Sequence, residues 1–215
     1  MKIKDQLLLD YLHKRFPEAG CALHFASDLE CLVAIALSAQ TTDVSVNKVT
    51  PILFAHFSDA KAYAEGPLEA IENDIRSLGL YRNKAKNLQA LGKALSESYG
   101  GVVPHSFEDL VKLPGVGTKT AGVFLLERGD RPAIPVDTHV SRVSIRLGYA
   151  KSGDSPLAIE KKLEKTFPKE EWKFLHHSLI WFGREECHAQ KPNCGACPLK
   201  DYCSFFKKTS STTAK

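Results

Sequence analysis

A short turn rich in glycine and proline lies between two stretches of helical character near the middle of this chain. Residues 113–121 read L-P-G-V-G-T-K-T-A. Proline and glycine end the preceding helix and Thr118 begins the next, so the segment is predicted to be a hairpin between two helices. Such a hairpin presents backbone N–H groups that can bind a phosphate. The turn therefore favours a helical fold and a phosphate-bearing partner.

Lys119 comes directly after this turn and is a candidate nucleophile. An amine attacks carbon only in its neutral form, which partial burial and the N-terminal end of a helix both favour. Position 119 lies in the first turn of the predicted helix, so it meets one of these two conditions. A lysine there could equally contact a phosphate without taking part in chemistry, and the turn alone does not separate the two interpretations.

Asp137 follows eighteen residues later, ahead of a segment whose apolar residues Val140, Val143 and Leu147 have helical spacing. Aspartate is among the best N-caps, so one interpretation of this residue is purely structural. A carboxylate at this place can also stabilise a positively charged sugar or accept a proton from a nucleophile. The two interpretations are compatible, and the lysine and the aspartate together favour covalent chemistry on a nucleic acid.

The composition is typical of a globular protein. Of the 215 residues, 43% are hydrophobic and 25% are charged, and no apolar run is long enough to span a membrane. The N-terminus lacks the apolar core and cleavage site of a signal peptide, which predicts a cytoplasmic protein. The net charge of +4 does not prove a polyanionic partner, although five basic residues and no acidic residue lie between residues 76 and 94.

Helical signals recur along the sequence and no alternating strand pattern is visible, so the fold is predicted to be all-α. Ser27, Asp43 and Ser106 are expected to begin helices, and Ser155 precedes a proline at the first position of another. Residues 207–215 are rich in serine, threonine and lysine, and they are predicted to form a disordered tail.

Four of the six cysteines lie close together near the C-terminus, with the spacing C-x6-C-x2-C-x5-C. A disulfide framework is not expected in a cytosolic chain of this size, so the cluster indicates a metal centre. Structural zinc sites usually combine two close pairs of ligands, and only one close pair is present here. By spacing alone, zinc and an iron–sulfur cluster remain equally good alternatives.

Taken together, these motifs resemble the endonuclease III family, the bifunctional DNA glycosylases of the helix-hairpin-helix superfamily. The resemblance rests on L-P-G-V-G-T-K-T-A, V-D-T-H-V-S-R-V and the four cysteines, in this order and at these separations. Residues 37–48, 79–85 and 176–184 also match the family. A glycine hairpin alone occurs in other DNA-binding proteins, whereas the lysine, the aspartate and the four cysteines together are highly specific.

The resemblance implies a chemical role for the matching residues. Lys119 would attack C1′ of the damaged nucleotide with the assistance of Asp137. A 4Fe–4S cluster would be held by four residues, Cys187, Cys194, Cys197 and Cys203. The implied activity is the removal of oxidised pyrimidines, such as thymine glycol, followed by β-elimination 3′ to the abasic site through a lysine Schiff base.

The resemblance also implies how DNA is bound. The hairpin would contact phosphate through the backbone amides of three residues, Gly115, Val116 and Gly117. Gln40 would fill the gap left by a flipped base, and Leu80 would be the wedge inserted into the stack. The loop after Cys187 carries only Lys191, with His188 as a weaker candidate, where the family tends to be more basic. Weaker phosphate contacts are therefore expected from that loop.

The implied fold has two α-helical domains. A six-helix barrel over residues 20–130 would contain the helix-hairpin-helix motif at about residues 106–127, and residues 1–19 with 131–206 would form the iron–sulfur cluster domain. Lys119 and Asp137 straddle this boundary, so the active site is expected in the cleft between the domains. The partner would be double-stranded DNA with a damaged base or an abasic site, and the enzyme is expected to be a monomer associated with the nucleoid.

Three other functions fit parts of the pattern. A photodimer- or mismatch-specific glycosylase of the same superfamily would share most motifs, although adenine-mismatch enzymes lack a lysine at position 119 and carry an extra C-terminal domain. A non-catalytic helix-hairpin-helix DNA-binding protein would need neither Lys119 nor Asp137. An electron-transfer protein is poorly supported, because the cysteines occupy a small C-terminal part of the chain.

Overall fold

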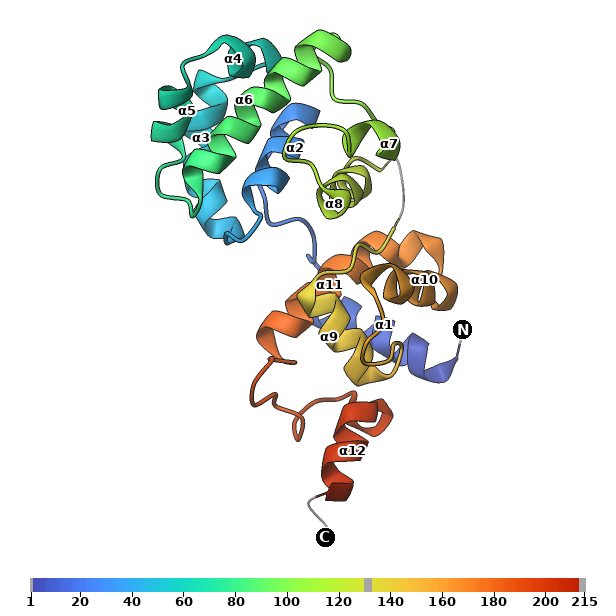
Figure 1. The fold of residues 1–215 in the computed structure, drawn as a ribbon. Coiled ribbons are helices and arrows are strands. Elements are labelled where there is room, and N and C mark those ends of the chain that lie inside the picture. Colours follow the sequence, from blue (N-terminus) through green and yellow to red (C-terminus); the bar gives the residue numbers. More distant parts are fainter. Residues whose placement is uncertain (1, 130–132, 213–215) are drawn as a thin grey trace. The chain divides into compact units, whose positions relative to one another are not determined.

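The computed structural model describes residues 2–129 and 133–212, and all regular structure in these two ranges is helical (Figure 1). The prediction of an all-α fold is therefore confirmed. By its contacts the chain forms two compact units, one of residues 21–131 and the other of residues 1–20 with 132–215. The predicted domain boundaries lie between residues 19 and 20 and between residues 130 and 131, each one position before the division of the two units.

The unit of residues 21–131 has one apolar core. In its described residues the helices are α2 Asp28–Leu37, α3 Asp43–His56, α4 Ala60–Glu65, α5 Leu68–Asp74, α6 Tyr81–Ser98, α7 Phe107–Leu110 and α8 Thr118–Arg128. There are seven rather than the six predicted for the barrel, because Gly66 ends α4 and Pro67 begins α5 as separate short helices. Figure 1 shows α2 and α8 side by side, with α6 running along α4 and α5.

Helix α2 is the most buried element of this unit. Its residues from Cys31 to Ile35 are all buried. Ser27 caps the helix, since its hydroxyl accepts a hydrogen bond from the Glu30 N–H at 3.2 Å. Helix α8 packs against α2, so the helix that carries Lys119 is anchored on the core of the unit.

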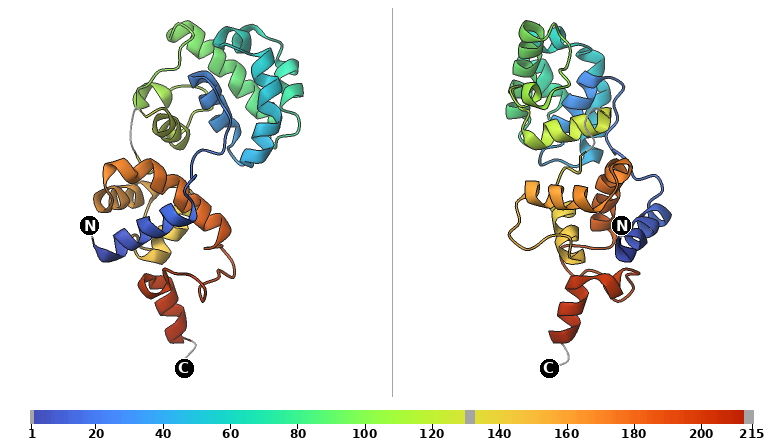
Figure 2. Two further views of the ribbon diagram at one scale, coloured as in Figure 1. Left: turned by 180° about the vertical axis from the view of Figure 1, so that it is seen from behind. Right: turned by 90° about the vertical axis from the view of Figure 1, so that its right-hand side faces the viewer.

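The other unit has its own core. Its helices in the described residues are α1 Ile3–Arg15, α9 Thr138–Leu147, α10 Pro156–Thr166, α11 Trp172–Glu185 and α12 Ser204–Thr212, with short 3₁₀ turns at Lys169–Glu171 and Lys200–Tyr202. Helix α11 packs against both α1 and α9, and both views of Figure 2 show it beside these two helices. The N-terminal helix thus shares a core with segments more than one hundred residues away in the sequence.

Two local expectations differ from the structure. The N-cap of α3 is Thr42 rather than Asp43, because the Thr42 hydroxyl accepts the Ser45 N–H at 3.2 Å and Asp43 becomes the first helical residue. Residues 207–212 belong to α12 instead of a disordered tail. Phe205 at the start of that helix stacks under the Arg146 guanidinium, which ties the helix to α9. The remaining predicted tail residues, 213–215, lie outside the described residues.

None of the helices in the described parts of the chain combines the length and the apolar character needed to cross a bilayer.

Gly92 provides a test of how closely α6 approaches α4. A Cβ atom at this position would lie 2.5 Å from the Tyr63 Cβ and 2.6 Å from the Ala60 carbonyl oxygen. Alanine normally stabilises a helix by about 1 kcal/mol relative to glycine, but here overpacking of about 1–3 kcal/mol opposes that gain. We expect Gly92→Ala to lower the free energy of unfolding measured by urea denaturation.

Gly79→Ala is the matched control, because a Cβ atom there would meet nothing within 4 Å. It should change the free energy of unfolding by less than about 0.5 kcal/mol. A Gly92→Ala protein as stable as the parent would contradict the close packing of the two helices.

Candidate functional site

The predicted hairpin joins α7 to α8, and its two glycines have different roles. Gly115 has φ of +76°, and a Cβ atom there would lie 3.0 Å from the Asn87 Cβ, so both its conformation and its surroundings require glycine. Gly117 has ordinary extended backbone and nothing within 4 Å of a Cβ position. The chain itself therefore does not require glycine at position 117.

The amides of the hairpin are only partly available to a ligand. The Val116 N–H donates to the Leu113 carbonyl at 3.1 Å and the Val116 side chain is buried. The Gly117 N–H has no acceptor among the described residues, and Gly117 caps α8 without a side chain. The Gly115 N–H likewise has no acceptor among the described residues. The open donors are thus the amides of Gly115 and Gly117 and those of the first turn of α8, where the helix dipole also favours an anion.

Lys119 is the second residue of α8 and its side chain is exposed. Of the two conditions that favour a neutral amine, the helix N-terminus is present beside Lys119, whereas burial of the Lys119 side chain by the described residues is not. Ala121, Phe124 and Leu125 hold the same helix in the core with no more than 1% exposure. The amine is therefore presented to solvent from a rigid helix.

Three residues other than glycine have a left-handed backbone in the described parts of the chain, namely Gln40, Leu80 and Lys191. All three are predicted DNA-contacting residues. Such conformations cost on the order of 1–3 kcal/mol and concentrate at functional sites. The left-handed residues are thus three positions for which the resemblance implies DNA contacts.

Gln40 and Leu80 are both exposed at the ends of helices. Gln40 lies in the turn after α2, and Leu80 is the N-cap residue of α6 with 61% of its surface exposed. A large aliphatic side chain at an exposed, strained position has no packing role in the chain itself. Lys84 contacts both turns, because its Nζ donates to the Leu37 carbonyl and its backbone N–H donates to the Leu80 carbonyl. Sequence reasoning missed this residue, since a lysine in a basic stretch carries no signal of its tertiary partners.

Asp137 is the N-cap of α9, as predicted. Its Oδ1 accepts the Val140 N–H at 2.7 Å, and the side chain is half-buried. Burial lowers the pKa of the neighbouring His139, although the charge of Asp137 acts in the opposite direction. A neutral His139 ring also fits its contact with Arg142, whose guanidinium lies 3.1 Å from Nδ1 and can only donate.

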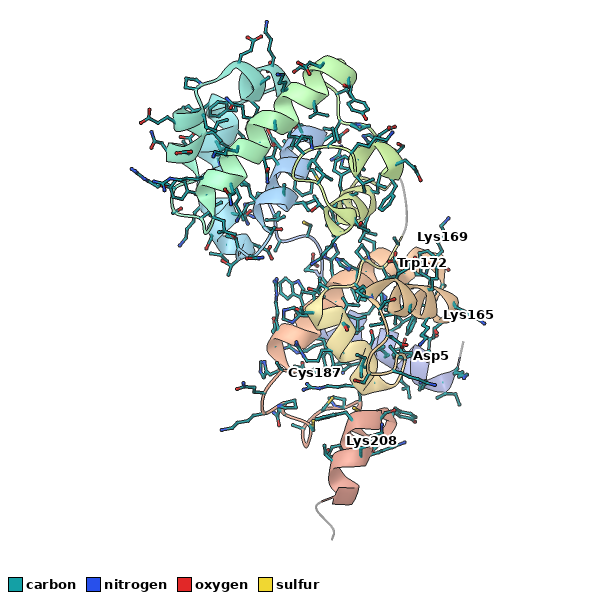
Figure 3. All side chains as sticks on the ribbon, viewed as in Figure 1. Asp5, Lys165, Lys169, Trp172, Cys187 and Lys208 are labelled. Atoms are coloured by element: carbon teal, nitrogen blue, oxygen red, sulfur yellow. The ribbon has the colours of Figure 1, made fainter. Side chains whose placement is uncertain are left out.

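The four predicted metal ligands, Cys187, Cys194, Cys197 and Cys203, line one pocket at the end of α11. Figure 3 shows Cys187 where the chain leaves that helix. Apolar side chains make up much of the rest of the wall, including Leu147, Phe182, Phe205 and Phe206. Burial and the neighbouring cysteines raise the pKa of Cys194. Thiolates at this place therefore need a compensating cation.

Two arginines of α9 hold the start of the cysteine loop. Arg146 donates to the carbonyl oxygens of His188 and Ala189 at 2.6 and 2.9 Å and to the Cys187 Sγ at 3.3 Å. Arg142 donates to the Cys187 carbonyl at 3.1 Å. These contacts, which the sequence did not reveal, join the loop to the helix that Asp137 begins.

The cysteine pocket supplies the donor set of an iron–sulfur cluster. Four cysteines line one largely apolar pocket and can provide the four thiolate ligands that a cluster with several iron atoms takes.

Comparisons with known proteins agree with this site. Residues 33–169 match the HhH-GPD superfamily of base excision DNA repair proteins, and residues 187–203 match the iron–sulfur binding domain of endonuclease III. Endonuclease III of Bacillus subtilis (strain 168) is 50% identical over 203 residues, which are 94% of this chain and 93% of that protein. The chain belongs to the endonuclease III family.

Other members of the endonuclease III family give the same result. Endonuclease III of Escherichia coli (strain K12) is 40% identical over 96% of this chain and 98% of its own. Solved structures of a trapped endonuclease III–DNA covalent intermediate and of a non-covalent endonuclease III–DNA complex each match with a TM-score of 0.89, at 50% and 49% identity over 98% of this chain and 100% of theirs. A thermostable thymine-DNA glycosylase at 23% identity and a TM-score of 0.84 shares the fold alone.

The membership confirms the predicted fold class, activity class and cofactor. The chain is a base excision repair DNA glycosylase and abasic-site lyase, and its cofactor is the 4Fe–4S cluster of endonuclease III.

The cofactor leads to a direct measurement. Protein purified without oxygen should be yellow-brown, with visible charge-transfer absorbance and about four iron and four sulfide per chain. The Cys194→Ser variant should lose the colour and part of the bound iron. One equivalent of zinc in place of iron in the parent protein would contradict the assignment.

Proposed function

We propose that this endonuclease III family member removes oxidised pyrimidines from double-stranded DNA, with Lys119 as the nucleophile and Asp137 as the assisting carboxylate. The observation that carries the proposal is the presentation of Lys119. Its amine is exposed in the first turn of α8, directly after the open Gly117 amide. A phosphate bound at the helix N-terminus would hold the adjacent sugar within reach of that amine.

The chemistry follows from an amine nucleophile. Lys119 Nζ forms a bond to C1′ while the bond from C1′ to the base breaks, and the base leaves as it takes up a proton. The C1′–O4′ bond then breaks, with O4′ taking up a proton and the nitrogen losing one, which leaves an imine joined to the opened sugar. This imine makes the C2′ proton acidic, so its removal expels the 3′ phosphate by β-elimination. A water nucleophile would instead leave an intact abasic site, and a lysine therefore explains both activities.

Asp137 is suited to assist without leaving its cap. One of its oxygens accepts the Val140 N–H at 2.7 Å, which leaves the other oxygen available. A carboxylate in this position can stabilise positive charge that develops on the sugar and can accept the proton that the attacking amine loses. Its use as an N-cap fixes its orientation.

The remaining predicted residues would act on the DNA duplex. A base must leave the stack before C1′ can be attacked, at a cost of a few kcal/mol. We propose that Leu80 and Gln40 offset this cost by filling the vacated space, and that Lys191 contacts a phosphate from the cysteine loop. The left-handed backbone of all three supports these roles. The enzyme would act as a monomer on chromosomal DNA of the nucleoid.

The catalytic pair can be tested by borohydride trapping. With a thymine glycol duplex, the parent protein should form a covalent complex, because borohydride reduces the imine. Lys119→Gln should abolish trapping and retain binding of the duplex in a mobility-shift assay. Asp137→Asn keeps an N-cap residue, so it should fold normally and slow base release by about 10²-fold or more.

Trapping that persists in Lys119→Gln would show that another residue is the nucleophile. A side-by-side assay with dihydrouracil, photodimer and mismatch duplexes tests the substrate class. Preferred cleavage of a photodimer or a mismatch would favour the alternative specificities.

Substitutions at the two hairpin glycines should distinguish an effect on DNA binding from an effect on folding. Gly117→Ser introduces a good N-cap into open space, so the melting temperature should not fall, yet its side chain would occupy the place of a phosphate. We expect at least about tenfold weaker binding of a duplex, with a smaller slope of log affinity against log salt. Gly115→Ser should instead lower the melting temperature, because position 115 requires a positive φ. Unchanged DNA affinity in Gly117→Ser would rule out phosphate binding at this turn.

A further inference from the structure

Lys84 uses its side chain inside the protein although it lies in a basic stretch of sequence. Its Nζ donates to the Leu37 carbonyl at 2.9 Å and forms a second, short hydrogen bond to the Thr41 hydroxyl. Burial lowers the pKa of this amine. A lysine that only served the surface charge would keep its ammonium in water, so these contacts indicate a specific task.

The two acceptors of Lys84 lie on either side of Gln40. The Thr41 N–H bonds to the Ser38 carbonyl at 3.1 Å, which closes a tight turn with Gln40 at its exposed, left-handed position. Leu37 ends α2 just before this turn, and the last turn of α2 has no basic residue of its own. The ammonium of Lys84 supplies the positive charge that stabilises the C-terminal end of that helix.

The backbone of Lys84 holds the other strained residue. The Lys84 N–H donates to the Leu80 carbonyl at 3.0 Å, the first intrahelical bond after the left-handed N-cap of α6. Lys84 therefore contacts Leu80 through its main chain and the Gln40 turn through its side chain. Among the described residues, these are two of the three left-handed positions that are not glycine.

We propose that Lys84 is a positioning residue that keeps the Gln40 turn in register with Leu80, so that both side chains enter the DNA stack together. This inference rests on the proposed roles of Gln40 and Leu80. Two insertions from separate turns fill one vacated space only if the distance between the turns is held constant. The Lys84 bridge supplies that constraint at the cost of a partly desolvated charge, which its two oxygen acceptors stabilise.

The test compares Lys84→Met, Lys84→Arg and Lys93→Met in the full-length protein with its cluster. Lys93→Met removes the same charge from the same helix, and its exposed 3.9 Å pair with Glu97 contributes little. We expect Lys84→Met to slow base release from a thymine glycol duplex by at least about tenfold under single-turnover conditions, because a displacement of about 1 Å can cost about 10²-fold. Lys84→Arg should recover most of the rate, and Lys93→Met should match the parent.

Two further measurements distinguish positioning from general stability. Affinity for undamaged duplex should stay within about twofold of the parent in Lys84→Met, since the hairpin is unchanged. A 2-aminopurine placed opposite the lesion should brighten less with this variant, because insertion into the stack is impaired. The slowing should also be smaller at a preformed abasic site, where no base has to leave the stack.

Thr41→Val keeps the shape of the side chain and removes the hydroxyl that Lys84 bonds. It should slow base release in the same direction, and the double variant with Lys84→Met should be no slower than Lys84→Met alone. Thr41→Val also provides the answer if Lys84→Met fails to fold. Parent-like base release in both single variants would overturn the inference, as would an equal loss of duplex affinity and base release.

Gln40→Ala and Leu80→Ala separate this inference from the function on which it rests. If neither slows base release, the proposed insertion of these side chains fails. If both slow base release and Lys84→Met does not, the insertion stands and the bridging role of Lys84 is wrong.

Discussion

Helix α6 is the element on which the arrangement of the turns proposed to contact DNA in residues 21–131 depends. Gly92 lets it approach α4 closely enough that no side chain fits between the two backbones. Near its start, Lys84 bonds to the end of α2, and Asn87 lies against Gly115 of the hairpin. Leu80, the turn of Gln40 and the hairpin thus all take their positions from one helix packed into the core.

This arrangement explains why strain is tolerated at the exposed turns. Left-handed Leu80 and Gln40 are unfavourable by on the order of 1–3 kcal/mol each, and neither contributes buried apolar surface in return. The surrounding hydrogen bonds from Lys84 and the closed turn at Ser38 hold them in place. In the proposed function, the strained conformation would present both side chains to the base stack of DNA.

Helix α9 has a corresponding role in the other unit. Asp137 begins it with an N-cap bond, and Arg142 and Arg146 donate to the backbone of the cysteine loop from its later turns. The proposed carboxylate and the loop that carries Lys191 are thus held by one rigid element. The four cysteines that line the neighbouring pocket lie along this loop and the chain that follows it, so a cluster bound there would tie these segments together.

The sequence by itself determined the all-α class, the hairpin, the candidate nucleophile and carboxylate, and the four candidate ligands of the cluster. These features are local: caps, turns and ligand spacings depend on residues within a few positions of one another, so a pattern reveals them. The same locality explains the errors, since Asp43 and Thr42 are both good caps and a polar segment such as residues 207–212 becomes helical only through its neighbours.

Only the tertiary structure decided which backbone amides of the hairpin are open, that Lys119 is exposed, and that Lys84, Arg142 and Arg146 bind distant turns. The contacts of these basic side chains join residues far apart in the sequence, since Lys84 and Leu37 are 47 positions apart and Arg146 and His188 are 42 positions apart. A lysine or arginine has the same sequence signature on a solvated surface and in such a bridge. The physical reason is that its partners are backbone carbonyls, which every residue possesses and no motif records.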